Sequence, residues 1–94
     1  MEIKQIEHGS KGAFLVEENN ERLAEMTYSK AGDKLLIIDH TEVSDQLRGT
    51  GAGKKLVLAA VEFARKSDRK ILPLCPFAKS VFDRTPEIHD VLSQ

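Results

Sequence analysis

The chain is organised around one glycine-rich stretch, Gln46-Leu47-Arg48-Gly49-Thr50-Gly51-Ala52-Gly53. Before it, Lys34–Val43 contains the apolar run Leu35–Ile38, which predicts a strand buried on both faces and therefore central in a sheet. After it, apolar residues recur at helical spacing over residues 51–66. The stretch therefore joins a central strand to a helix, and its closely spaced glycines allow backbone N–H groups to converge on an anion.

The remaining segments predict further strands before this unit and a short strand and helices after it. Gly12–Ser29 alternates apolar and polar residues on either side of a polar turn and predicts two strands. Lys70–Leu74 predicts a short apolar strand, and Phe77–Arg84 a second helix. Thr85-Pro86 predicts the start of a last helix, with Thr85 as its N-cap. This order predicts an alpha+beta fold in which an antiparallel meander leads into one parallel β–α–β crossover.

Length and charge restrict the class of protein. Residues 1–94 are enough for one small domain, and we expect a monomer. A net charge of -1 argues against a protein that coats nucleic acid. The basic residues gather between Arg48 and Lys70, which suits a small polyanionic ligand. We expect a cytoplasmic protein without a membrane partner, for three reasons. The chain has one cysteine, its N-terminus has no apolar core, and its longest apolar run is Leu56–Val61.

Residues 46–55 do not fit two other kinds of glycine-rich phosphate-binding loop. A Walker-type phosphate loop requires a glycine where Arg48 stands and Ser or Thr where Lys55 stands. A dinucleotide-binding fingerprint requires a glycine where Lys54 stands. Both patterns fail, and a flexible connector that binds nothing is the remaining alternative.

The pattern Arg/Gln-x-x-Gly-x-Gly/Ala fits residues 48–53 at every fixed position, and the apolar Val43 stands five residues before it. In these features the chain resembles the GNAT (GCN5-related) superfamily of N-acetyltransferases, and more narrowly its short, stand-alone, single-domain branch. The resemblance covers roughly Gly12–Pro86. It implies a GNAT-like mixed sheet, truncated relative to full-length members.

The resemblance also implies a binding mode for acetyl-CoA. Strand 34–43 would splay away from strand 70–74, and the pantetheine arm would enter that gap and pair with main-chain groups of strand 34–43. The pyrophosphate would lie on the glycine loop, and a backbone N–H near Val43 would polarise the acetyl carbonyl. The residues expected to bind acetyl-CoA are Thr41, Glu42, Val43, Arg48, Gly49, Thr50, Gly51, Ala52, Gly53 and Lys54.

Two catalytic groups of related enzymes are absent from their usual places. The leaving thiolate is often protonated by a tyrosine beyond the last parallel strand, but the only tyrosine here, Tyr28, lies in the second predicted strand. Ile37 stands where histone-modifying members carry a glutamate base. The candidates that remain are Cys75, directly after strand 70–74, and His40, near the end of strand 34–43. We expect one of two routes. Either Cys75 takes the acetyl group as an acetyl-enzyme, with His40 assisting thiolate formation, or the amine attacks directly and Cys75 or water protonates the departing CoA.

The resemblance implies transfer of an acetyl group from acetyl-CoA to a primary amine. An acyl-CoA-binding or regulatory module without turnover is the first alternative, and a protein-interaction domain is the second. Three histidines and one cysteine without metal-ligand spacing predict no metal site. The acidic segment Glu17–Glu25 is either a solvated hairpin tip or a surface that attracts a cationic amine substrate.

Overall fold

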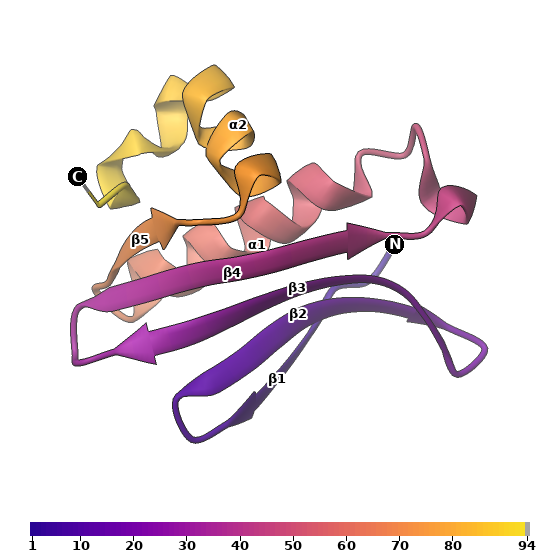
Figure 1. Cartoon of the computed structure of the whole chain (residues 1–94), viewed down its shortest axis with the longest axis horizontal. Coiled ribbons are helices and arrows are strands. Elements are labelled where there is room, and N and C mark those ends of the chain that lie inside the picture. The colour runs from indigo at the N-terminus through magenta and orange to yellow at the C-terminus, as the bar shows by residue number, and fades with distance from the viewer. Residues whose placement is uncertain (94) are drawn as a thin grey trace.

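The computed structural model describes residues 1–93 of the chain, as a mixed sheet with helices packed on it (Figure 1). The five strands are β1 (Lys4–His8), β2 (Lys11–Glu18), β3 (Glu21–Ala31), β4 (Leu35–Val43) and β5 (Lys70–Pro73). The helices are α1 (Ala52–Lys66) and α2 (Pro76–Arg84), and two short 3-10 segments are η1 (Asp45–Leu47) and η2 (Pro86–Val91).

The strands follow one another across the sheet in the order β1-β2-β3-β4-β5. The first four pair antiparallel, and β5 lies parallel to β4. A parallel neighbour cannot be reached through a tight turn, and α1 provides the crossover. The predicted alpha+beta fold, an antiparallel meander followed by one parallel β–α–β crossover, is confirmed.

Strand β1 was not predicted. All five of its residues are exposed, and the segment lacks the alternation of apolar and polar residues that indicates a half-buried strand. It is fixed by pairing with β2 and by Tyr28 of β3, whose hydroxyl donates to Glu7 at 2.6 Å and accepts from Gln5 at 2.7 Å.

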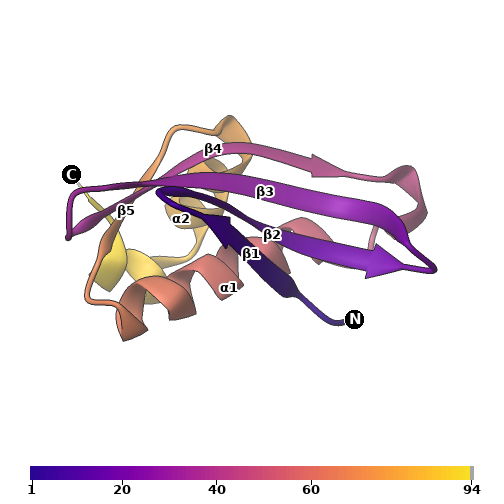
Figure 2. The same ribbon diagram turned by 90° about the horizontal axis from the view of Figure 1, so that it is seen from below.

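Strands β3 and β4 carry the centre of the core. Ala24, Met26 and Tyr28 are buried, as their alternation predicts. Leu36 and Ile38 are also fully buried, but Leu35 and Ile37 are only half-buried, so the prediction that β4 is covered on both faces is wrong. The reason is that α1 lies along one face of the sheet (Figure 2), and the side chains of β4 alternate between that face and the other.

Helix α1 presents an apolar stripe to the sheet. The buried side chains at helical spacing include Leu56, Val57, Ala60, Val61 and Ala64. Phe63 is half-buried, and its ring lies 5.9 Å from that of Tyr28 between centroids. The stripe is therefore as predicted, and it fixes how the glycine loop at the start of α1 lies against the sheet.

The C-terminal segment packs beside α1 and β5. Helix α2 begins at Pro76, one residue before the predicted start. The predicted last helix is the 3-10 segment η2. Thr85 is its N-cap residue, as predicted, but the Thr85 side chain makes no capping hydrogen bond. Ile88 and Val91 of η2 are nevertheless buried. In the part of the chain that the structure describes, no helix has the length and apolar character needed to cross a membrane.

Candidate functional site

Strands β4 and β5 separate partway along β4. Their parallel pairing ends with Ile38 opposite Pro73, and the N–H groups of Leu74 and Cys75 both donate to the carbonyl of Ile38, at 3.1 and 3.2 Å. Strand β4 continues for five more residues, to Val43. Within the described chain, the edge of β4 beyond Ile38 therefore has no neighbouring strand on the β5 side, and a gap opens there.

The backbone of β4 presents polar groups to this gap. The Ser44 N–H donates to the Leu23 carbonyl at 2.7 Å, so every second N–H of β4, including that of Glu42, points toward β3. The N–H groups of Thr41 and Val43 point the other way, into the gap. Of the three strand residues expected to meet acetyl-CoA, Thr41 and Val43 therefore have N–H groups on the gap side, that of Thr41 in a hydrogen bond to the Cys75 sulfur. The main chain of Glu42 takes part in the β3–β4 pairing.

A β-bulge in β4 sets which side chains face the core near the gap. Thr27 of β3 lies opposite His40 while Tyr28 lies opposite Ile38, so Asp39 is an extra residue in β4. A bulge of this kind shifts the alternation of the side chains that follow it. Thr41 consequently points to the same side as Ile38, and His40 points to the opposite face of the sheet.

Cys75 lies at the point where the two strands separate. Its side chain is 5% exposed, and Sγ lies 3.4 Å from Thr41 Oγ1. Burial alone raises the pKa of the Cys75 thiol, but hydrogen bonds from the Thr41 hydroxyl and from backbone amides, including those of Ala78 and Phe77 in the first turn of α2, bring this pKa below its ordinary value. The thiol is thus buried, and its hydrogen bonds make the thiolate, which is the nucleophilic form, easier to reach than in an ordinary cysteine.

His40 is not brought to Cys75. Its side chain is 61% exposed, and its Nε2 lies 3.8 Å from Glu42 Oε1 on the same face of β4. Because the bulge turns Thr41 toward the thiol and His40 away from it, the expected pairing of His40 with Cys75 is not formed. Sequence reasoning missed Thr41 as the contact of this thiol, because the two residues are 34 positions apart and only the shift at Asp39 brings them together.

The glycine loop turns sharply into α1. Gly49 and Gly51 have φ angles of 81° and 77°, a region that glycine occupies without steric cost. Thr50 is tied to the short segment η1, with its hydroxyl donating to the Leu47 carbonyl at 2.6 Å. The first hydrogen bond of the helix runs from the Lys55 N–H to the Gly51 carbonyl, so the amides of residues 52–54 precede the helical pattern and are open to an anion.

Gly53 has a different role from Gly49 and Gly51. It lies within the first turn of α1, and a Cβ added there would be 2.6 Å from Cζ of Phe77 in α2. The glycine is therefore needed for close packing of the two helices. The pattern Arg/Gln-x-x-Gly-x-Gly/Ala also fits residues 46–51, and in that register both fixed glycines are the two with positive φ.

These elements enclose a pocket of about 300 Å³ at the end of β4. The glycine loop, the first turn of α1 and one face of α2 along its length form its walls, and Val43, 39% exposed, and Phe77, 38% exposed, line it. The lining residues are Val43, Leu47, Arg48, Gly49, Gly51, Ala52, Gly53, Lys54, Phe77, Val81 and Arg84.

Positive charge at this pocket comes from three side chains. Lys54 and Arg84 both line it. Arg48 lines it as well, although its guanidinium donates to Asp45 at 2.7 Å on the surface. Together with the open amides of α1, these cations could hold a diphosphate. Cys75 lies outside the pocket lining, at the point where β4 and β5 separate. In residues 1–93 no group of three or more His, Cys, Asp or Glu side chains is arranged to bind a metal ion.

The sequence profile of the family described as GCN5-related N-acetyl-transferase matches residues 13–91. This match includes the meander from β2 onward, the glycine loop, the crossover and the segment around Cys75. The chain belongs to this family. Its curated relatives include Protein NATD1 from Gallus gallus, 32% identical over 84 residues that cover 87% of this chain and 76% of the relative. Protein NATD1 from Xenopus tropicalis is 33% identical over 63 residues, which cover 67% of this chain and 58% of that protein.

Solved structures agree with membership of the GCN5-related N-acetyltransferase family. A GCN5-like protein from Staphylococcus aureus superposes with a TM-score of 0.72 and is 42% identical, with 98% of this chain and 87% of that chain covered. A ribosomal-protein-alanine N-acetyltransferase from Brucella melitensis superposes with a TM-score of 0.69 at 15% identity, over 82% of this chain and 62% of that one, and shows the shared fold alone. Family and fold together support acetyl transfer as the general activity of this chain.

Proposed function

We propose that this chain transfers the acetyl group of acetyl-CoA to a primary amine, with its cofactor-phosphate cradle at residues 48–54. The observation that carries the proposal is the pocket at the end of β4, where the two positive-φ glycines, the open amides of α1 and the start of the gap meet. The pyrophosphate would lie on the loop, and the pantetheine arm would follow the amides of Val43 and Thr41 toward Cys75.

The transfer itself requires that an amine nitrogen attack the thioester carbonyl, so that a C–N bond forms and the C–S bond breaks. The acetyl oxygen becomes negative in the transition state, and an N–H of β4 that faces the gap is a suitable donor to it. Holding the thioester next to the amine supplies a large part of the rate enhancement.

Cys75 and His40 are the residues we propose for proton and acyl transfer. Since the hydrogen bonds to Cys75 favour its thiolate, Cys75 can accept the acetyl group as an acyl-enzyme, or as a thiol it can protonate the departing CoA. His40 lies on the other face of β4, beside Glu42, where it can take the proton that the attacking amine loses. The two residues then act on opposite sides of the strand.

The decisive experiment is a calorimetric titration with acetyl-CoA, followed by intact-protein mass spectrometry. Lys54→Glu reverses a charge at the pocket and is expected to weaken binding about tenfold or more, which corresponds to 1.4 kcal/mol. Lys66→Glu is the matched control, since it makes the same change in the last turn of the same helix. Equal binding by both variants would contradict the cradle.

Turnover separates the proposal from a binding module without activity. Cys75→Ser keeps a side chain of similar size. If transfer goes through an acyl-enzyme, this variant should form no acetyl-enzyme and turn over much more slowly. If the amine attacks acetyl-CoA directly, the variant should keep substantial activity. Acetyl-CoA binding without any acetylated product, across a panel of amines, would instead support a regulatory module. Full activity in both Cys75→Ser and His40→Ala would show that both side chains are structural.

A further inference from the structure

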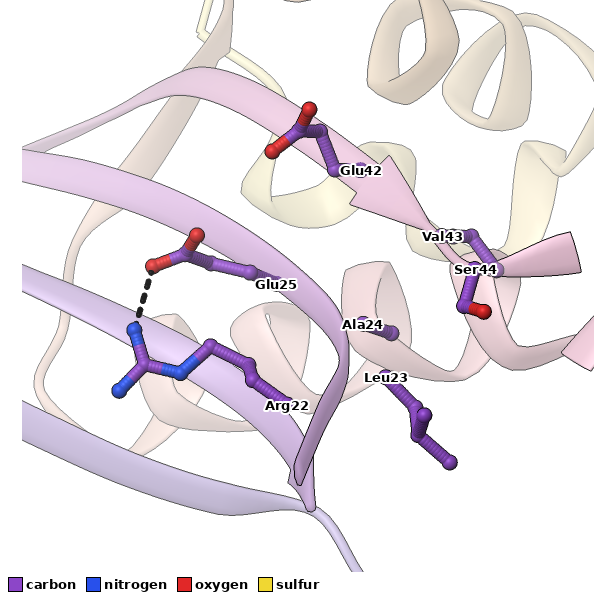
Figure 3. A pocket seen from close by; sticks show the side chains of 7 residues that line it. All are labelled: Arg22, Leu23, Ala24, Glu25, Glu42, Val43 and Ser44. Atoms are coloured by element: carbon purple, nitrogen blue, oxygen red, sulfur yellow. Dashed lines mark hydrogen bonds and ion pairs between the residues drawn. The ribbon is translucent and has the colours of Figure 1, made fainter. Parts of the chain in front are cut away.

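A second pocket lies on the other side of Val43 from the pocket at the glycine loop. It has a volume of about 310 Å³, at the ends of β3 and β4 where the chain enters and leaves the neighbouring turns (Figure 3). Its lining residues are Arg22, Leu23, Ala24, Glu25, Glu42, Val43 and Ser44. Because Val43 lines both pockets, the second pocket adjoins the gap in which the thioester is proposed to lie.

The charges of this pocket are unbalanced. Glu25 and Glu42 are directly opposite each other in the β3–β4 pairing, an arrangement in which like charges repel. Glu25 accepts a hydrogen bond from Arg22 at 3.1 Å, and in Figure 3 its carboxylate lies between Arg22 and Glu42. Glu42 is 73% exposed, and within residues 1–93 the only side chain at ion-pair distance from it is the His40 imidazole, at 3.8 Å, which carries a charge only when protonated. Two carboxylates and one guanidinium leave a net negative site that a cation would stabilise.

The rest of the lining suits an aliphatic chain. Leu23 and Ala24 form the buried base of the pocket, and the partly exposed Val43 separates it from the gap. Glu42 is the strand neighbour of both Thr41 and Val43, whose amides face the gap. A chain of four or five carbons is comparable in length with two residues of extended strand, roughly 7 Å, and can span this distance.

We propose that this pocket binds the acetyl acceptor, and that the acceptor is a small amine that carries a second positive charge at the other end of a short aliphatic chain. This inference rests on the proposed acetyl transfer. One ammonium group lies between Glu25 and Glu42, the carbon chain lies over Val43, and the second amine reaches the thioester in the gap. Binding of the charged end fixes which nitrogen is acetylated.

The test is an NMR titration of the protein without acetyl-CoA, using 1,5-diaminopentane and, as the matched probe with a single charge, n-pentylamine. We expect 1,5-diaminopentane to shift the amide signals of residues 22–25 and 42–44 and to bind about tenfold more tightly than n-pentylamine. Glu42→Gln and Glu25→Gln should each remove most of this difference. Glu18→Gln is the control, because Glu18 and Glu21 form another directly opposed pair, in the neighbouring β2–β3 hairpin, and neither lines the pocket.

The outcomes separate this inference from the proposed function. Equal affinity for the two probes, or equal loss of affinity in Glu18→Gln and Glu42→Gln, overturns the pocket as an acceptor site, because the effect would then be general charge attraction. Acetyl-CoA titrations of Glu25→Gln and Glu18→Gln should be unchanged, and failure of the wild-type protein to bind acetyl-CoA would overturn the proposed function alone. In turnover assays, Glu25→Gln should raise KM for 1,5-diaminopentane about tenfold with little change in kcat, and an unchanged KM contradicts the inference.

Discussion

The thiol of Cys75 and the hydroxyl of Thr41 meet at the point where β4 and β5 separate, with Sγ 3.4 Å from Oγ1. The contact joins the end of the meander to the start of α2, across 34 positions of sequence. It depends on the bulge at Asp39, without which the side chain of Thr41 would point to the opposite face of the sheet.

The contact between Thr41 and Cys75 should control the reactivity of the thiol. Thr41→Val keeps the shape of the side chain but removes the hydroxyl that stabilises the thiolate, so the pKa of Cys75 should rise. The measurement is the rate of alkylation by iodoacetamide as a function of pH, followed by intact mass, and its midpoint should move to higher pH. Thr41→Ser retains the hydroxyl and should behave like the wild type. An unchanged midpoint in Thr41→Val would show that burial and backbone amides, those of Thr41, Phe77 and Ala78, set the thiol pKa without the hydroxyl.

Alkaline pH should destabilise the protein through Tyr28. Burial raises the pKa of Tyr28 to about 12, and the hydrogen bond to Glu7 acts in the same direction. Its contribution to stability is therefore fully present below the unfolded-state pKa near 10 and is lost as the pH rises toward 12. The size is on the order of 2 kcal/mol. Urea denaturation at several pH values should show a steeper alkaline loss of the free energy of unfolding in the wild type than in Tyr28→Phe, and parallel curves would contradict the assignment.

Acetyl-CoA should raise the melting temperature. A ligand that binds only the folded state stabilises it by about 2.7 kcal/mol at a hundredfold excess over Kd. In a domain of this size the shift in melting temperature is on the order of 10 °C. Differential scanning fluorimetry should show this shift for the wild type and for Lys66→Glu, and a smaller one for Lys54→Glu. A melting temperature that stays constant at saturating acetyl-CoA would contradict the proposed function.

Gly53 and Phe77 should be coupled in their effects on stability. In an otherwise unchanged protein, Gly53→Ala improves helix propensity by about 1 kcal/mol but forces the Phe77 ring to move, and overpacking typically costs 1–3 kcal/mol. In the background of Phe77→Ala the obstacle is gone, so Gly53→Ala should be more favourable there by about 1–2 kcal/mol. Chemical denaturation of the four proteins measures this difference.

A matched control for this cycle is Gly49→Ala. Nothing lies within 4 Å of a Cβ added to Gly49, but its φ of 81° makes the substitution unfavourable in any background. Its effect should therefore add to that of Phe77→Ala without coupling. Additive behaviour of Gly53→Ala as well would mean that the Phe77 ring moves aside freely.

The order of the elements could be predicted from the sequence because each carries its own local signal. The alternation in β3, the stripe of α1 and the proline that begins α2 all depend on residues close together in the chain. The glycine loop could be placed between a strand and a helix for the same reason. Strand β1 carries no such signal, since its residues are exposed and its position depends on pairing with β2 and on Tyr28.

The sequence by itself determined the antiparallel meander, the parallel crossover and the place of the glycine loop, because periodicity and glycine spacing are local properties. Only the tertiary structure decided which residues meet at the site. The one extra residue at Asp39 reverses the faces of all the side chains that follow it in β4, so that Thr41, and not His40, reaches Cys75. Pairing between β3 and β4 sets Glu25 opposite Glu42, and the close packing of Phe77 against α1 requires a glycine at position 53. Such contacts join residues far apart in the chain, and their geometry follows from register and packing that no local pattern encodes.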